Sequence, residues 1–322
     1  MSSEPGPTIT TDVLGEPWLA ETIDLAADFE GEVVATLVSR SAAAPTDRAV
    51  LHVHGFSDYF FQTEYAEWWI DRGHDMYALD LRKYGRSLRD HQSGTYVADL
   101  SAYFEELDAA WERITKRDGH TRVIIAAHST GGLIVPLWAE ARRPEGLEGV
   151  LLNSPWLDLQ GPAWMRSRPA NLALAQAGKR APMRELTRDV SGFYARGLHK
   201  DHDGEWEFNL DWKPLGSFPV RFGWLAAIRA GHAQLQAGLD VDCPVLVLSS
   251  DRSSAPKAMG EDVFTTDIVL DVRQIRRWAT AIGRHVTYVA VPGAIHDVVL
   301  SRRPARDRVY DEIARWLGAY VD

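Results

Sequence analysis

Residues 123–135 read VIIAAHSTGGLIV, an apolar run that leads through His128, Ser129 and Thr130 into a helix-like segment. A Ser between a strand and a helix, with small residues two positions before and two after it, is typical of a nucleophile elbow. Here the small residues are Ala127 and Gly131, and larger side chains there would collide with the neighbouring backbone. The stretch therefore predicts a Ser nucleophile, and the alternative is a buried strand that enters a helix past an incidental Ser.

Short apolar runs alternate with longer helical patterns through most of the chain. Nearly continuous apolar strands are what a parallel sheet covered on both faces requires, so the alternation predicts a doubly wound, mostly parallel α/β sheet. A hairpin with a turn at Glu30-Gly31 precedes it. The expected strands are 49–53, 75–79, 123–126, 150–153, 245–248 and 286–290, and the expected helices are 63–72, 96–116, 132–142, 272–282 and 306–320.

The alternation stops between Asn153 and Val245, where Trp, Pro, Arg and short helical pieces replace it. We expect residues 156–240 to form a helical cap inserted into a core made of residues 1–155 and 241–322. Many of the 12 Trp lie in this middle third. They favour either an ordinary core or an aromatic-lined pocket for an apolar ligand.

Functional side chains of an open parallel sheet gather at the carboxyl ends of its strands. His296 follows the last predicted strand in a Gly-containing loop, where its imidazole can reach Ser129 as the base. A Ser, an acid and a His in this chain order are the arrangement of the α/β-hydrolase fold.

The acid of this triad has three candidates. Asp251 lies at a strand end, whereas Asp267 follows the apparent insertion 252–266 and is succeeded by a helix, a strand and then His296. That second order is the usual one, so we expect Asp267 to be the acid, with Asp251 second and Asp271 third. It would hold the imidazole in one tautomer and stabilise the cation that forms.

The remaining expectations concern the oxyanion hole and the pocket. Two backbone N–H groups must converge on the developing alkoxide, and the chain positions of Thr130 and Phe56 suit them. His54 and Trp156, which end or follow two other strands, are expected to contact substrate.

Composition limits the partners. The net charge of −10 argues against nucleic acid and anionic membrane surfaces, and no apolar run approaches the about 20 residues that span a bilayer. The only cysteine is Cys243, which excludes an intrachain disulfide. The His- and Asp-rich run 199–205 is explained as well by a solvated loop as by a metal site. We expect a cytoplasmic protein without metal or cofactor that acts on a small molecule.

Six short stretches together resemble the monoacylglycerol lipase and lysophospholipase-like branch of the serine α/β-hydrolases. They are 54–57 (HGFS), 80–82 (DLR), 85–87 (GRS), 128–132 (HSTGG), 267–269 (DIV) and 293–296 (GAIH). Two departures are Lys83-Tyr84, where the family pattern has Gly-His, and the insertion 252–266. The resemblance implies a carboxylic ester hydrolase that forms an acyl-enzyme. The alternatives are a peptidase or acyltransferase with the same triad and a non-catalytic binding protein.

Overall fold

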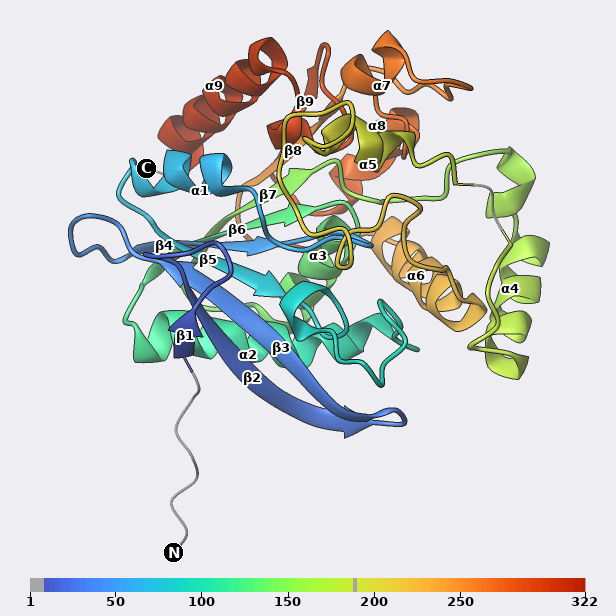
Figure 1. Cartoon of the computed structure of the whole chain (residues 1–322), viewed down its shortest axis with the longest axis horizontal. Helices are drawn as coiled ribbons and strands as arrows, with labels where there is room; N and C mark the ends of the chain where they lie inside the picture. Colours follow the sequence, from blue (N-terminus) through green and yellow to red (C-terminus); the bar gives the residue numbers. More distant parts are fainter. Residues whose placement is uncertain (1–8, 188–189, 322) are drawn as a thin grey trace, which may run out of the picture.

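The structure is a computed structural model that describes residues 9–187 and 190–321. Within these residues nine strands form one sheet, in the order β1-β2-β3-β5-β4-β6-β7-β8-β9 (Figure 1). The strands are β1 (Ile9–Thr11), β2 (Leu19–Asp28), β3 (Gly31–Arg40), β4 (Arg48–Val53), β5 (Asp75–Asp80), β6 (Arg122–His128), β7 (Leu147–Asn153), β8 (Val245–Ser250) and β9 (Val286–Val291).

The sheet is parallel from β5 to β9 and antiparallel at its other edge. Strands β2 and β3 form the predicted hairpin, and β3 pairs antiparallel with β5. Strands β5, β4, β6, β7, β8 and β9 then pair in parallel, each with its neighbour. The mostly parallel, doubly wound α/β-hydrolase fold is confirmed, and each predicted strand lies within an observed one. The short strand β1 was not predicted.

Helices cover both faces of the sheet. The α-helices are α1 (Thr63–Ile70), α2 (Phe104–Glu112), α3 (Gly131–Arg142), α4 (Arg168–Arg180), α5 (Phe193–Leu198), α6 (Phe222–Gln236), α7 (Glu261–Thr265), α8 (Val272–Trp278) and α9 (Arg303–Tyr320). Short 3-10 turns are η1 (Gly85–Ser87), η2 (Leu100–Tyr103), η4 (Ala163–Arg166), η5 (Ala279–Ala281) and η6 (Val298–Leu300), and η3 (Arg113–Arg117) is a π-turn.

Alternate residues of one strand enter two separate cores. In β6, Val123, Ile125 and Ala127 pack with helices α2, α3 and α8, while Ile124 and Ala126 pack with α1 and α9. Figure 1 shows α1 and α9 on one side of the sheet and α2 and α3 on the other. This two-sided burial is why the strands read as continuous apolar runs.

The segment between β7 and β8 contributes no strand to the sheet in its described residues. Its helix α6 packs on α4, where Gly178 approaches Ala226, and also on α3, where Gly231 approaches Leu137. Because α6 contacts both α4 in the cap segment (156–240) and α3 in the core, the boundary of that segment remains a prediction. In the described part of the chain, no helix combines the length and the apolar character that crossing a membrane requires.

Candidate active site

Ser129 lies at the tight turn between β6 and α3. Its φ of +51° is the left-handed conformation that an elbow imposes on a non-Gly residue. A Cβ on Gly131 would lie 2.5 Å from the carbonyl oxygen of His54, and one on Gly55 would lie 2.9 Å from the Cβ of Ser129. The turn is therefore packed tightly against the end of β4, and Gly is required on both sides of that contact.

Three side chains form one hydrogen-bonded chain behind this turn. The Oγ of Ser129 lies 3.0 Å from Nε2 of His296, whose Nδ1 lies 3.0 Å from Oδ2 of Asp267. All three residues are buried, and Asp267 is fully so. The other oxygen of Asp267 accepts the backbone N–H groups of Val269 and Leu270, at 2.8 and 2.7 Å. These bonds orient the carboxylate, which in turn favours the His296 tautomer that can accept the Ser proton.

The insertion 252–266 explains how an acid so far past β8 reaches the site. The chain leaves β8, forms α7 and returns, so that Asp267 bridges to Ser253 beside the end of the strand. The N–H of Asp267 donates to the carbonyl of Arg252 at 3.0 Å. Asp251 is exposed, and Asp271 caps α8 and pairs with Arg273. Of the three candidates, Asp267 alone has a hydrogen bond to His296 among the described contacts.

A pocket of about 420 Å³ opens above Ser129. The core supplies Phe56 and Thr130, which are the expected oxyanion donors, and the first residue of the cap segment, Trp156, also lines the pocket. The rings of Phe56 and Trp224 lie 4.3 Å apart and those of Trp156 and Trp224 5.8 Å, so that one wall is aromatic. Further lining residues come from the cap segment, namely Gln160, Val190, Ser191, Gly192, Tyr194, Ala195, Lys213, Pro214, Leu215, Ser217 and Val220.

His54 does not line this pocket. It is fully buried beside Tyr84, its Nδ1 donates to the carbonyl of Gly55 at 2.8 Å, and its Nε2 accepts the N–H of Leu81 at 3.0 Å. Burial lowers the pKa of His54, which agrees with a neutral ring that has one donor and one acceptor. The expected substrate contact by His54 is therefore corrected: this side chain braces the loop after β4 against β5.

A buried polar cluster beside the triad was missed in the sequence. Asp58 accepts from Lys213 Nζ at 2.7 Å and lies 3.2 Å from Nδ1 of His128, whose ring packs on His296 with 4.9 Å between centroids. Burial by itself would lower the pKa of His128, but the carboxylates of Asp297 and Asp58 outweigh it and raise that pKa above its usual value. Asp58 and His128 lie near motif residues and could have been found, whereas nothing in the cap sequence marks Lys213.

The same cluster is the one group of described residues with metal-like spacing. Ligand atoms of Asp58, His128 and Asp297 lie within 4.8 Å of one another. The ammonium of Lys213 already supplies the positive charge next to Asp58, so the donor set does not favour a cation there. In the run 199–205, both ring nitrogens of His199 have backbone partners, at Phe208 and Asp201.

The departure at Lys83-Tyr84 has a structural explanation. Lys83 is fully buried, and its ammonium pairs with Asp28 and Glu30, each at 2.5 Å, near the turn of the β2–β3 hairpin. The residue thus anchors the hairpin and does not line the pocket.

Comparison with known proteins agrees with this architecture. The sequence model of the serine aminopeptidase S33 family matches residues 44–302. A phospholipase of Bacillus subtilis (strain 168) is 28% identical over 112 residues, which are 34% of this chain and 41% of that protein.

Two solved structures show the same fold. A soluble variant of the monoglyceride lipase of Saccharomyces cerevisiae, in complex with a substrate analog, superposes with a TM-score of 0.66 at 18% identity, over 93% of this chain and 95% of that chain. The monoacylglycerol lipase of Paleococcus ferrophilus gives 0.62 at 17% identity, over 87% and 98%. Since the family model covers most of the chain, the resemblance drawn from the sequence is confirmed, and the protein belongs to the serine aminopeptidase S33 family.

Proposed function

We propose that this protein is a carboxylic ester hydrolase that forms an acyl-enzyme on Ser129. The observation that carries the proposal is the hydrogen-bonded chain from Ser129 through His296 to Asp267 beneath a largely apolar pocket. The named lipases and the phospholipase among its relatives support the same class of reaction.

The proposed reaction has two halves. Oγ of Ser129 attacks the ester carbonyl while Nε2 of His296 takes its proton, and Asp267 stabilises the imidazolium. Backbone N–H groups of Phe56 and Thr130 hold the oxyanion of the tetrahedral intermediate. His296 returns the proton to the leaving alcohol, and a water activated by the same His then releases the acid.

The pocket favours an apolar acyl group. Its aromatic wall and the cap residues Leu215 and Val220 offer apolar contacts, and its volume is in the usual range for small-molecule sites. We assign these contacts to the cap segment (156–240), including a substrate contact by Trp156. The small-molecule substrate and the cytoplasmic location expected from the sequence stay predictions.

An aminopeptidase reading of the same triad is less well supported. Such enzymes anchor the positive substrate amine, which calls for a carboxylate facing the pocket. Among the described residues that line it there is no Asp or Glu, and Asp58 nearby is paired with Lys213. Other carboxylates of the cap segment, Glu185, Glu205 and Glu207, do not line the pocket either, and Asp189 lies outside the described residues.

The test is hydrolysis of p-nitrophenyl esters from two to sixteen carbons, next to aminoacyl p-nitroanilides, by wild type and Ser129→Ala. We expect ester turnover that Ser129→Ala abolishes, and a preferred chain length that reports the size of the pocket. Turnover of the anilides alone would replace the esterase by a peptidase. Ester turnover that survives in Ser129→Ala would refute the proposed nucleophile.

A further inference from the structure

The loop after β4 carries Phe56, which is proposed to supply one of the two oxyanion donors. A backbone donor stabilises the transition state only if its position is fixed in advance, because the benefit depends on geometry within a fraction of an ångström. What holds this loop therefore bears directly on the reaction.

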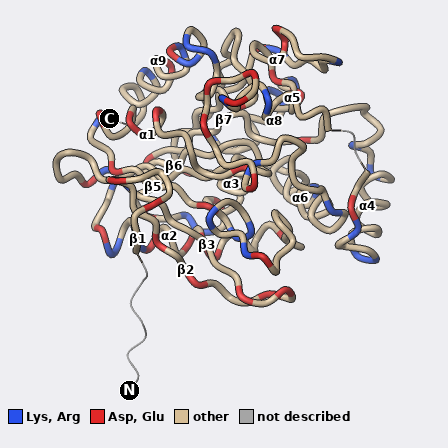
Figure 2. Tube along the Cα trace, viewed as in Figure 1, with Lys and Arg blue, Asp and Glu red and all other residues tan. Residues whose placement is uncertain are grey.

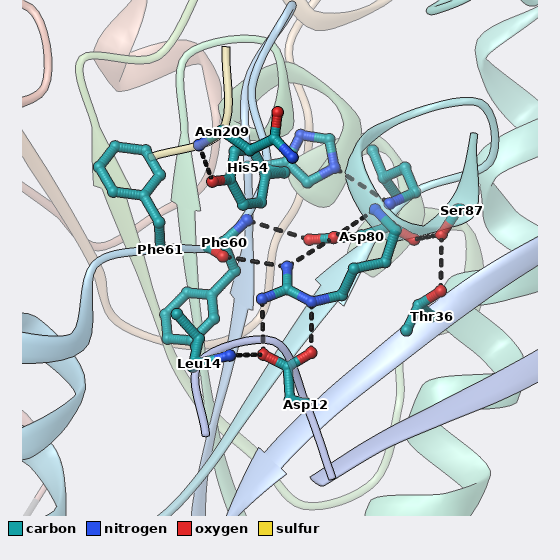
Figure 3. Close-up of polar contacts among 12 residues, drawn as sticks. Asp12, Leu14, Thr36, His54, Phe60, Phe61, Asp80, Ser87 and Asn209 are labelled. Carbon is teal, nitrogen blue, oxygen red and sulfur yellow. Dashed lines mark hydrogen bonds and ion pairs between the residues drawn. The ribbon is translucent and has the colours of Figure 1, made fainter. Parts of the chain in front are cut away.

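The core holds one end of the loop, at Phe60 (Figure 3). The N–H of Phe60 donates to Asp80 at 3.0 Å, and its carbonyl accepts from Arg86 at 3.0 Å. Arg86 also pairs with Asp80 at 2.8 Å and with Asp12, the residue after β1, at 2.5 Å. The end of the loop is thus tied to β5 and, through Arg86, to the N-terminal part of the chain.

The cap segment holds the middle of the loop at three consecutive residues. Ser57 Oγ accepts the N–H of Phe218 at 3.0 Å, and the hydroxyl of Tyr59 accepts the N–H of Asn209 at 2.6 Å. Between them, Asp58 pairs with Lys213 at 2.7 Å. In the two flanking contacts the cap contributes only backbone N–H groups, which almost any sequence provides. Lys213 is the one cap side chain of the three.

The ion pair is built into the interior. Lys213 is 5% exposed and Asp58 is 1% exposed. The ammonium of Lys213 also lies 5.7 Å from the ring centroid of Phe61 and 5.7 Å from that of Tyr194. Burial opposes ionisation of Asp58, yet Lys213 and His128 hold the pKa of its carboxyl well below the usual range. If this buried ion pair separated, each charged group would be left poorly solvated, and the pair is therefore held in a fixed geometry.

We propose that Lys213 is a positioning residue: through Asp58, the cap holds the loop after β4 so that the Phe56 N–H faces the oxyanion. The inference rests on the proposed function. It makes the cap a part of the catalytic apparatus as well as a wall of the pocket, since the same carboxylate also contacts His128, the residue before Ser129.

The test compares Lys213→Met, Lys213→Arg and the double variant Asp58→Asn with Lys213→Met. The double variant removes both charges, so it is expected to fold even where a lone buried Asp58 hinders folding. Lys200→Met is the matched control, because Lys200 lies in the same cap segment and pairs with Glu207 at the surface. Each variant is measured for kcat and KM on one p-nitrophenyl ester.

Two inhibitors separate loop positioning from binding. A trifluoromethyl ketone adds to the Ser hydroxyl and carries an oxyanion, whereas the corresponding alcohol occupies the pocket without adding. For Lys213→Met and the double variant we expect kcat to fall about 10- to 100-fold with a nearly unchanged KM. The affinity for the ketone should fall by a similar factor and that for the alcohol should not. Lys213→Arg should retain more activity, and Lys200→Met should match wild type.

Unchanged kcat in the double variant, or equal losses of affinity for ketone and alcohol, would overturn the positioning role. These results leave the proposed function intact, whereas ester turnover by Ser129→Ala would refute that function itself. The two failures are therefore distinguishable.

Discussion

The two sides of the pocket are built in different ways. On the core side, Ser129 and His296 follow strands β6 and β9, and Asp267 returns to the end of β8, so the parallel sheet itself brings them together. On the cap side, Tyr194 lies on the short helix α5 and Lys213 on a segment without regular structure, and contacts with core loops hold them. The sheet thus positions the three residues of the proposed triad, whereas contacts with core loops position the cap residues of the pocket.

Charged residues contribute to the two sides of the pocket in different ways. Acidic and basic residues are interspersed along the described part of the chain (Figure 2). Inside, the pocket depends on individual pairs such as Lys213 with Asp58. Substitutions in the proposed triad should therefore remove turnover, whereas those on the cap side should have smaller effects, on kcat at Lys213 and on stability or selectivity elsewhere.

The largest effect is expected at the acid on the core side. Asp267→Asn keeps the shape of the side chain but removes the charge that orients and stabilises the His296 imidazolium. We expect kcat for an ester to fall on the order of 10⁴-fold with the fold intact by circular dichroism. Asp251→Asn, at an exposed residue, is the control and should leave kcat unchanged. Equal losses in the two variants would contradict the assignment of the acid.

The second prediction concerns pH and a His behind the cap side of the pocket. His232 in α6 is fully buried, accepts from Arg229 at 2.9 Å and donates to the carbonyl of Trp156 at 2.8 Å. Burial, together with the charge of Arg229, lowers the pKa of His232 to about 3. The unfolded chain binds this proton below about pH 6.5, so the free energy of unfolding should decrease as the pH falls from there toward 3.

The slope from this one group is about 1.4 kcal/mol per pH unit, or about 3 kcal/mol between pH 6.5 and 4. His232→Gln removes the titration, and the difference in unfolding free energy from wild type should therefore shrink or reverse toward pH 4 in urea titrations. His91→Gln, at an exposed His, should keep the wild-type pH dependence. If the unfolding free energy of His232→Gln kept the wild-type dependence on pH, the His232 ring would take up its proton in the folded protein as in the unfolded chain, which would contradict this prediction.

The smallest effect is expected on selectivity. Leu215→Trp adds an indole to the cap wall of a pocket of about 420 Å³. We expect kcat/KM for long acyl esters to fall about 10-fold while two-carbon esters are hydrolysed as before. Leu172→Trp, at a Leu of α4 that is 71% exposed, should leave the chain-length profile unchanged. An unchanged profile in Leu215→Trp would place the acyl group elsewhere.

Sequence patterns were informative where burial and local geometry act on adjacent residues. The strands were predicted because both faces of the sheet are covered, and the elbow was predicted because its turn tolerates only small neighbours. Helix ends were less certain: the pattern over 272–282 contains α8 and the separate turn η5. The strand β1, with the sequence ITT, is too short to show a pattern.

Site residues follow the same division. Ser129 and His296 carry local motifs, and Asp267 could be chosen by its position relative to the next helix and strand, although their catalytic roles remain to be tested. His54 shares a strand end with true pocket residues, but its ring turns toward the backbone of Leu81. Lys213 could not be found, because its partner Asp58 lies far away along the chain and only the folded cap joins them.

The central claim is an acyl-enzyme on Ser129, and rapid-quench mass spectrometry tests it most directly. The protein is mixed with a p-nitrophenyl ester, quenched in acid within the first turnover and digested. We predict a peptide containing Ser129 that is heavier by one acyl group, formed as p-nitrophenol is released and missing in Ser129→Ala. Two results would contradict the account. One is an acyl group on a different residue. The other is ester turnover with no acyl adduct in the burst phase and no labelling of Ser129 by a fluorophosphonate.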